Sequence, residues 1–279
     1  MEPTRILQRA CRHMAESNDA RRRQADCIPR NARRNGNSRY DSSLQGGRLT
    51  GIGGFVISLG NGQIALGDCL DVMRSVPSAS VDLVLTDPPY TMTKTGNSCR
   101  PNYMPDGQIL SGVITPVQLW MNECFRVLKT GHFYTFVNKN DLCEYLNSAE
   151  KAGFRLHNII TMIKNTKMPN RWYLKYSELV LFFFKGKAKP INNLTSRDYE
   201  LVEMPQLFNG KLHPTQKPLT FVEKLMLNSS VTGDTILDPF LGSGTTAITA
   251  ENTGRRWIGI ERDPTYFGAA CDRIARHLA

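Results

Sequence analysis

From about residue 60 to the C-terminus, short apolar runs alternate with longer amphipathic segments, and this alternation limits the possible folds more than any other feature. Repeated strand–helix alternation favours a parallel sheet, because each helix returns the chain to the end of the sheet at which the next strand begins. Such sheets are covered by helices on both faces. We therefore predict an α/β fold of Rossmann-like type, with a mostly parallel, seven-stranded sheet between two layers of helices.

The predicted elements follow from the spacing of apolar residues. The strands are 63–68, 81–87, 132–137, 156–164, 177–185, 234–238 and 256–261. The helices are 69–76, 115–129, 142–152, 218–230, 245–253 and 265–278. In sheets of this kind ligands bind beyond the carboxyl ends of the strands, so the residues that follow each strand are the first candidates for a site.

Charge is unevenly distributed along the chain. The sequence has 35 Lys and Arg against 25 Asp and Glu, a formal charge of +10, which favours a polyanion as partner. Residues 1–50 contain eleven arginines and few apolar residues, so burial cannot offset the entropy of ordering them. We predict a basic, flexible tail over 1–55 and one folded domain over 56–279. The tail is either an electrostatic arm for a polyanion such as DNA or a dispensable extension.

The seven cysteines are scattered, without a C-x-x-C pair or a histidine at metal-ligand spacing. This pattern argues against a disulfide framework and against a zinc site. The longest apolar run, 179–184, is too short to cross a bilayer. We therefore expect no metal site, no membrane association and a reduced, cytoplasmic setting.

The predicted strand 234–238 runs directly into the sequence PFLGSGTT. Gly242 and Gly244 permit a tight turn and close approach of a ligand, and the helix that follows offers free N–H groups. The next strand ends at Glu261, nineteen residues after Gly242, the offset at which an acid can accept hydrogen bonds from both hydroxyls of an adenosine ribose. The combination predicts a nucleotide-type ligand; the alternative is a glycine-rich turn followed by a solvated glutamate.

A second candidate lies where the predicted strand 81–87 ends in the sequence DPPY. Pro88 and Pro89 fix the backbone and offer no N–H donors, so the turn would hold the Asp87 carboxylate, the Pro88 carbonyl and the Tyr90 ring around one point. Acceptors capped by an aromatic ring suit a planar group that carries an amino substituent. Taken alone, an aspartate that starts a proline-rich turn would be the simpler interpretation.

Four motifs together resemble those of the S-adenosylmethionine-dependent DNA amino-methyltransferases, which make N6-methyladenine or N4-methylcytosine. The motifs are DPPY (87–90), HPTQKP (213–218), DPFLGSGTT (238–246) and WIGIERDPTY (257–266). DPPY precedes the glycine loop, as in the circularly permuted beta group, and the resemblance covers about residues 60–276. It implies a circularly permuted class I methyltransferase fold.

The resemblance also implies a role for each motif. Asp87 and the Pro88 carbonyl would accept the two amino hydrogens of a flipped-out base, and Tyr90 would stack on that base. Asp68 and Cys69 match the position that contacts the adenine of S-adenosylmethionine. The implied cofactor-binding residues are Asp68, Cys69, Thr215, Lys217, Asp238, Phe240, Gly242, Ser243, Gly244, Thr245 and Glu261.

Within that set, Glu261 would hold the ribose, the glycine loop the methionine part, and Thr215 with Lys217 the cofactor carboxylate. For Lys217 the alternative is a surface lysine at the start of a helix. The family's reaction needs neither a metal nor a covalent intermediate.

Contact with DNA is predicted for residues 163–175, where basic and aromatic side chains mix in a way suited to phosphates and an exposed base. A solvated basic loop is an equally good interpretation. Residues 186–212 stand where the family has its target-recognition region, and the segment is short. The candidate DNA-binding residues are Lys164, Lys167, Arg171, Trp172 and Lys175.

The sequence thus predicts a site-specific DNA methyltransferase that acts on the N6 amine of adenine, with S-adenosylmethionine as cofactor and DNA as partner. The nearest alternative is N4-cytosine methylation; the aspartate of DPPY favours adenine, because the cytosine enzymes more often have serine there. A non-catalytic DNA-binding relative is disfavoured, since the motif residues are intact. A homodimer and a cognate restriction endonuclease stay open as partners.

Overall fold

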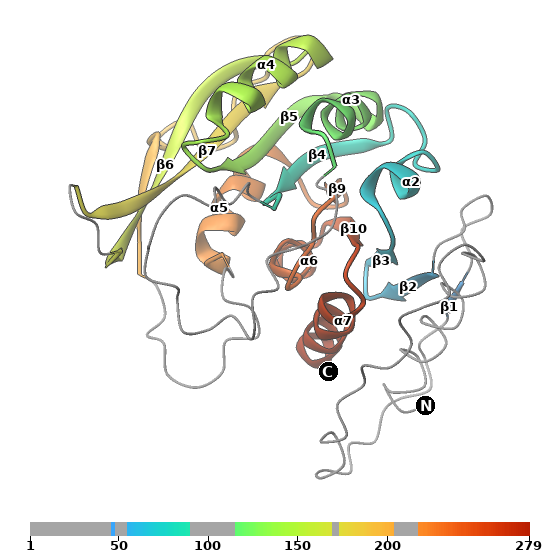
Figure 1. The fold of residues 1–279 in the computed structure, drawn as a ribbon. Helices are drawn as coiled ribbons and strands as arrows, with labels where there is room; N and C mark the ends of the chain where they lie inside the picture. The colour runs from blue at the N-terminus through green and yellow to red at the C-terminus, as the bar shows by residue number, and fades with distance from the viewer. Residues whose placement is uncertain (1–45, 48–54, 90–114, 169–172, 204–216) are drawn as a thin grey trace, which may run out of the picture.

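The computed structural model describes residues 46–47, 55–89, 115–168, 173–203 and 217–279. Within these ranges ten strands form one sheet, in the order β1-β2-β3-β10-β9-β4-β5-β7-β6-β8 (Figure 1). The strands are β1 (Gly46–Gly47), β2 (Phe55–Leu59), β3 (Gly62–Leu66), β4 (Val81–Thr86), β5 (Leu128–Val137), β6 (Arg155–Met168), β7 (Lys175–Phe184), β8 (Tyr199–Val202), β9 (Thr235–Asp238) and β10 (Arg256–Glu261). The helices are α2 (Cys69–Met73), α3 (Val117–Val127), α4 (Leu142–Ala152), α5 (Leu219–Ser229), α6 (Thr245–Asn252) and α7 (Pro264–Leu278).

Seven consecutive strands of this sheet, from β3 to β6, are the seven that the sequence predicts. β3, β10, β9, β4 and β5 run parallel to one another. β7 is antiparallel to both β5 and β6. The predicted α/β fold with a mostly parallel, seven-stranded sheet is therefore confirmed for the core of the sheet.

Three further strands extend the sheet and were not expected from the sequence. β2 pairs antiparallel with β3, β1 pairs with β2, and β8 adds to β6 within the segment 186–212. β8 escapes prediction because its short sequence YELV is mostly exposed at the edge, and β1 consists of two glycines. Gly46, Gly47 and Phe55 fall within the predicted tail but belong to the sheet; the rest of that tail lies outside the described residues.

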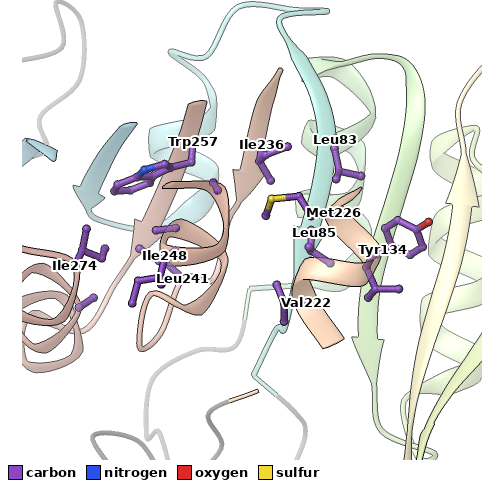
Figure 2. Packing of buried hydrophobic residues seen from close by; sticks show 14 of the residues in the cluster. Leu83, Leu85, Tyr134, Val222, Met226, Ile236, Leu241, Ile248, Trp257 and Ile274 are labelled. Carbon is purple, nitrogen blue, oxygen red and sulfur yellow. The ribbon is translucent and has the colours of Figure 1, made fainter. Parts of the chain in front are cut away.

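Helices cover both faces of the sheet, as predicted (Figure 1). On one face, Leu83 and Leu85 of β4 and Trp257 of β10 pack with residues of α5, α6 and α7 (Figure 2). On the other face, Val84 belongs to the cluster that includes Trp120 of α3 and residues of α2 and α4. Successive residues of β4 thus alternate between the two faces, which explains why this strand is apolar on both sides.

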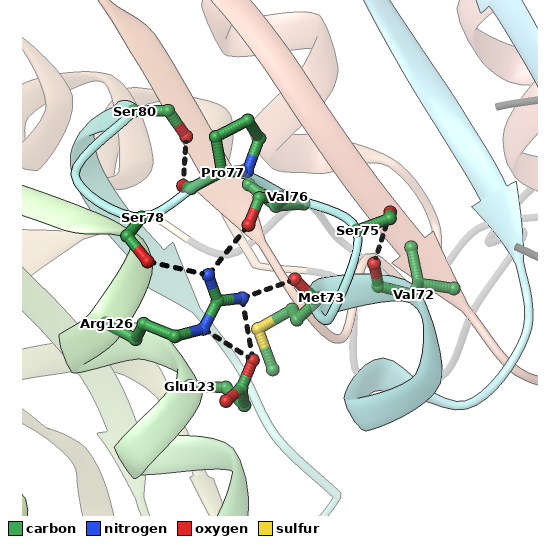
Figure 3. Close-up of polar contacts among 9 residues, drawn as sticks. All are labelled: Val72, Met73, Ser75, Val76, Pro77, Ser78, Ser80, Glu123 and Arg126. Atoms are coloured by element: carbon green, nitrogen blue, oxygen red, sulfur yellow. Dashed lines mark hydrogen bonds and ion pairs between the residues drawn. The ribbon is translucent and has the colours of Figure 1, made fainter. Parts of the chain in front are cut away.

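An arginine network joins α3 to the loop that follows α2 (Figure 3). The Arg126 guanidinium donates to the carbonyls of Met73 at 2.6 Å and Val76 at 2.9 Å, and it pairs with Glu123 at 2.8 Å. Met73 is the last residue of α2, where a cation complements the helix dipole. The network fixes the position of a short helix whose N-cap, Asp68, belongs to the candidate site described below.

None of the helices within the described ranges is long and apolar enough to span a membrane.

The central strand β4 provides a test of this packing. Leu83 is fully buried there, whereas Leu119 of α3 is 46% exposed. We expect Leu83→Ala to lower the free energy of unfolding by about 2–5 kcal/mol, because it leaves a cavity between strands and helices. The matched control Leu119→Ala should cost less than about 1 kcal/mol. Chemical denaturation followed by circular dichroism measures both, and equal losses would contradict the position of Leu83 in the core.

Candidate active site

The candidate site lies where the carboxyl ends of the parallel strands meet. β4 leads into Asp87, β9 ends at Asp238, β10 ends at Glu261, and Asp68 follows β3. Because these strands are parallel neighbours, their ends share one edge of the sheet. A pocket that is partly open to solvent lies at this edge. It is lined by Leu85, Thr86, Asp87, Phe136, Lys217, Val222, Asp238, Phe240, Leu241, Gly242, Ser243, Thr245 and Thr246.

The glycine loop between β9 and α6 turns tightly, as predicted. Gly242 and Gly244 have φ angles of +54° and +81°, a region that strains other residues. A Cβ atom on Gly244 would lie 3.1 Å from Cδ1 of Ile274, so α7 packs closely against the loop. A Cβ atom on Gly242 would meet nothing nearer than 3.9 Å, so the space beside this residue is open. The loop therefore presents its backbone to the pocket at Gly242.

Glu261 is bonded directly to this loop. Its Oε2 accepts a hydrogen bond from the Gly242 N–H at 2.9 Å, and its Oε1 accepts one from the Asp263 N–H at 2.8 Å. Burial raises the pKa of Glu261 above its usual range, against the opposing effect of these backbone donors. The residues that the sequence pairs by their spacing thus touch, and each carboxylate oxygen can accept a further hydrogen bond.

Asp238 links the glycine loop to β4. Its Oδ1 accepts hydrogen bonds from the Thr86 hydroxyl at 2.6 Å and from the Phe240 N–H at 3.1 Å. Burial raises the pKa of Asp238 to about 6, although the hydrogen bonds to its charged form act in the other direction. Asp238 therefore connects the ends of β4 and β9 through a buried hydrogen bond, and it also lines the pocket.

Asp87 lies at one end of an ion-pair network. The ammonium group of Lys217 contacts Oδ2 of Asp87 at 2.8 Å and Oε2 of Glu178, on β7, at 3.0 Å. Lys164 of β6 pairs with the other oxygen of Glu178. The Lys217 side chain is only 9% exposed, which rules out the alternative of a surface lysine. Lys217 thus contacts the acid of the DPPY motif.

Sequence analysis does not single out Glu178. The available signal is its charge, since it stands in the otherwise apolar strand sequence SELVLFFF, and acids are rarely buried without a partner.

Pro88 is buried and Pro89 half-buried directly after β4.

Asp68 and Cys69 lie together at the end of β3. Asp68 caps α2, because its Oδ1 accepts a hydrogen bond from the Leu70 N–H at 2.9 Å, and its Oδ2 accepts one from the Thr115 hydroxyl at 3.1 Å. Cys69 is buried, and burial together with the nearby Asp68 raises the pKa of its thiol to about 12. The thiol is therefore neutral and unreactive at physiological pH.

Arg273 of α7 is a second residue that sequence analysis does not identify. Its guanidinium donates to the Ser243 carbonyl at 2.8 Å and to the Thr245 hydroxyl at 3.1 Å, so it braces the glycine loop from behind. Phe240 anchors the other end of the loop, with its ring 5.3 Å from that of Trp120 in an edge-to-face contact. An arginine in an amphipathic terminal helix carries no sequence signal that distinguishes it from a surface residue.

Several predicted site residues lie outside the described part of the chain. These are Tyr90, Thr215, Arg171 and Trp172, together with the side chains of Lys167 and Lys175. Of the predicted DNA-binding set, Lys164 is described, and its ammonium group is engaged by Glu178.

Comparison with known proteins follows the same motifs. Residues 81–272 match a family model described as DNA methylase. The Type II methyltransferase M.HinfI of Haemophilus influenzae is 30% identical to this chain, over 76% of the chain and 67% of that protein.

Solved structures show the same arrangement of elements. The crystal structure of the M1.HpyAVI–SAM complex aligns with a TM-score of 0.61 and 27% identity, over 76% of this chain and 98% of that one. The PvuII DNA methyltransferase, described as cytosine-N4-specific, aligns with a TM-score of 0.60 over 79% of this chain and 92% of that one. At 18% identity, the second likeness shows the fold alone.

The pKa of Asp238 predicts a pH dependence of stability. A carboxyl whose pKa rises on folding to about 6 binds its proton more tightly in the folded state, so the free energy of unfolding should fall as the pH rises from about 4 to 6. We expect this component to be about 3 kcal/mol and to be constant above about pH 7. Asp238→Asn removes it. Urea denaturation of both proteins from pH 4 to 7 gives the difference; a difference that does not change with pH would contradict the buried, titrating Asp238.

Proposed function

The chain belongs to the N6/N4 DNA methylase family, and from this membership we propose that it transfers a methyl group from S-adenosylmethionine to the N6 amine of a flipped adenine in DNA. One observation carries the proposal. Asp87, which can accept a hydrogen bond from an amine, and the glycine loop, which suits the cofactor, line the same pocket. The two halves of a methyl-transfer site thus open onto one space.

The residues at the loop fit the cofactor, S-adenosylmethionine. The open space beside Gly242 accommodates a ligand against the backbone, Ser243 and Thr245 also line the pocket, and Glu261 offers acceptors for ribose hydroxyls. Asp68, at the end of the neighbouring strand, would contact the adenine of the cofactor. When bound, S-adenosylmethionine supplies an electrophilic methyl group on a sulfonium centre.

Asp87 and Pro88 would make the target amine reactive. The lone pair of an exocyclic amine is delocalised into the base, so the amine is a poor nucleophile. Hydrogen bonds from its two N–H groups to the Asp87 carboxylate and the Pro88 carbonyl would localise the lone pair on nitrogen and orient it. The negative charge of Asp87 would also stabilise the positive charge that develops on the amine. Tyr90 would stack on the flipped base and offset part of the cost of unstacking it.

The β6–β7 hairpin supports the proposal that DNA is the substrate. The hairpin extends beyond the helices that cover the sheet (Figure 1). At its outer end Tyr173 is 92% exposed and Tyr176 is also exposed, as aromatic side chains that stack on bases must be. We place the DNA contact there, with Lys167, Arg171, Trp172 and Lys175 as phosphate and base contacts, and the chain's charge of +10 favours the encounter.

The methylated base is the decisive test. DNA from a methyltransferase-deficient bacterial host that expresses the wild-type chain should contain N6-methyladenine in nucleoside mass spectrometry. Asp87→Ala should lower its level at least about 100-fold, because the amine loses its charged acceptor. Asp71→Ala, which removes an exposed acid of α2, is the matched control and should leave the level unchanged. N4-methylcytosine in place of N6-methyladenine would establish the alternative base, and no methylated base at all would refute the proposal.

Cofactor binding tests the position of Glu261 separately. We expect Glu261→Gln to weaken S-adenosylmethionine binding about tenfold, because an amide provides a poorer acceptor for the ribose and a donor that clashes with the N–H of Gly242. Glu144→Gln, at an exposed site on α4, is the control. Isothermal titration calorimetry gives both dissociation constants, and equal affinities would remove Glu261 from the cofactor site.

A further inference from the structure

Four charged side chains of alternating sign connect β6 to the DPPY motif. Lys164 pairs with Glu178, Glu178 pairs with Lys217 at 3.0 Å, and Lys217 pairs with Asp87 at 2.8 Å. Glu178 and Lys217 are mostly buried, with 20% and 9% of their side chains exposed. Glu178 lies two strands from β4, and neither the motifs nor the proposed chemistry uses it.

The surroundings of Lys217 show what Glu178 does to it. The ammonium group lies 4.7 Å from the centre of the Phe136 ring, on the apolar wall of the pocket. Burial acts to lower the pKa of Lys217, but the carboxylates of Asp87 and Glu178 raise it above its usual value. Likewise, burial acts to raise the pKa of Glu178, but the ammonium groups of Lys217 and Lys164 lower it. Lys217 is therefore protonated and Glu178 ionised at neutral pH.

The charge balance of the network sets how strongly Lys217 acts on Asp87. With Glu178 ionised, the ammonium group of Lys217 is in ion-pair contact with two carboxylates, those of Glu178 and Asp87. Without the charge of Glu178, Lys217 would pair with Asp87 alone in a poorly solvated place, where an ion pair is strengthened by the low dielectric. Asp87 would then be a weaker acceptor for a base amine, and Lys217 would lose one of the two contacts that fix its position.

We propose that Glu178 is a positioning residue of the methyl-transfer site, which holds Lys217 against Asp87 and limits the charge that Lys217 exerts on it. This role rests on the proposed function, because Asp87 is the group on which it acts. Glu178 touches neither base nor cofactor in this role; it works through Lys217 alone.

The test measures turnover of the full-length protein on unmethylated genomic DNA with tritiated S-adenosylmethionine. We expect Glu178→Gln to lower kcat about ten- to a hundredfold, because the acceptor is misplaced and over-neutralised. The KM for DNA should change less than about threefold, since Glu178 itself makes no contact with DNA in this role. Glu178→Asp keeps the charge and should retain an intermediate kcat. Asp71→Asn is the matched control, because it breaks the exposed ion pair of Asp71 with Arg74 outside the pocket, and it should leave kcat unchanged.

A double-mutant cycle separates positioning from a general effect on folding. If Glu178 acts through Lys217, then Glu178→Gln should cause no further loss of kcat, beyond about twofold, in a Lys217→Met background. Thermal melting of each variant identifies loss of fold, and Glu178→Asp provides the readout if Glu178→Gln does not fold. Wild-type kcat in both Glu178 variants, or losses that multiply in the double variant, would overturn the positioning role. Absence of methyl transfer by the wild type would overturn the proposed function as well.

Discussion

The parallel pairing of β4 with β9 is the constraint on which the rest of the structure depends. Leu83 pairs with Ile236 and Val84 with Leu237, and the backbone groups of two buried strands have no other partners of equal quality. At the site the ends of the same two strands are joined by a hydrogen bond from the Thr86 hydroxyl to the Asp238 carboxylate. These two residues are 152 positions apart in the sequence. Asp87 and the glycine loop are therefore placed side by side by the backbone of the sheet, and side chains add only the final orientation.

The acids of the site fall into two groups that differ in their partners. Asp238 and Glu261 are held by hydroxyl and backbone N–H donors, and burial raises the pKa of each. Glu178 is held by two lysines that lower its pKa, and Asp87 shares one of them. Neutral donors thus hold the two acids that lie beside the glycine loop. Charged partners instead contact Glu178 and Asp87, and the two lysines keep Glu178 ionised.

A residue of the candidate site could be identified from the sequence when it ends or directly follows a strand. Asp87, Gly242 and Glu261 follow or end strands with a clear apolar pattern, and the rule that ligands bind at the carboxyl ends of parallel strands was enough to group them. Glu178 and Arg273 reach the site from within a strand and a helix, so only the three-dimensional packing reveals their contacts. The edge strand β8 is only four residues long and half of its residues are exposed, which made it indistinguishable from a loop.

The permuted order of the strands also has a kinetic consequence. β6 and β7 are neighbours along the chain and pair as a hairpin, with Met168 opposite Lys175, so only a short loop must close to form them. The residues between β4 and β9 make up most of the domain. The entropy lost in closing so long a loop must be offset before the contact between these two strands stabilises the fold. The outer part of the sheet can therefore form before the centre, and the pocket, which exists only once β9 has docked beside β4, is among the last features of the molecule to be assembled.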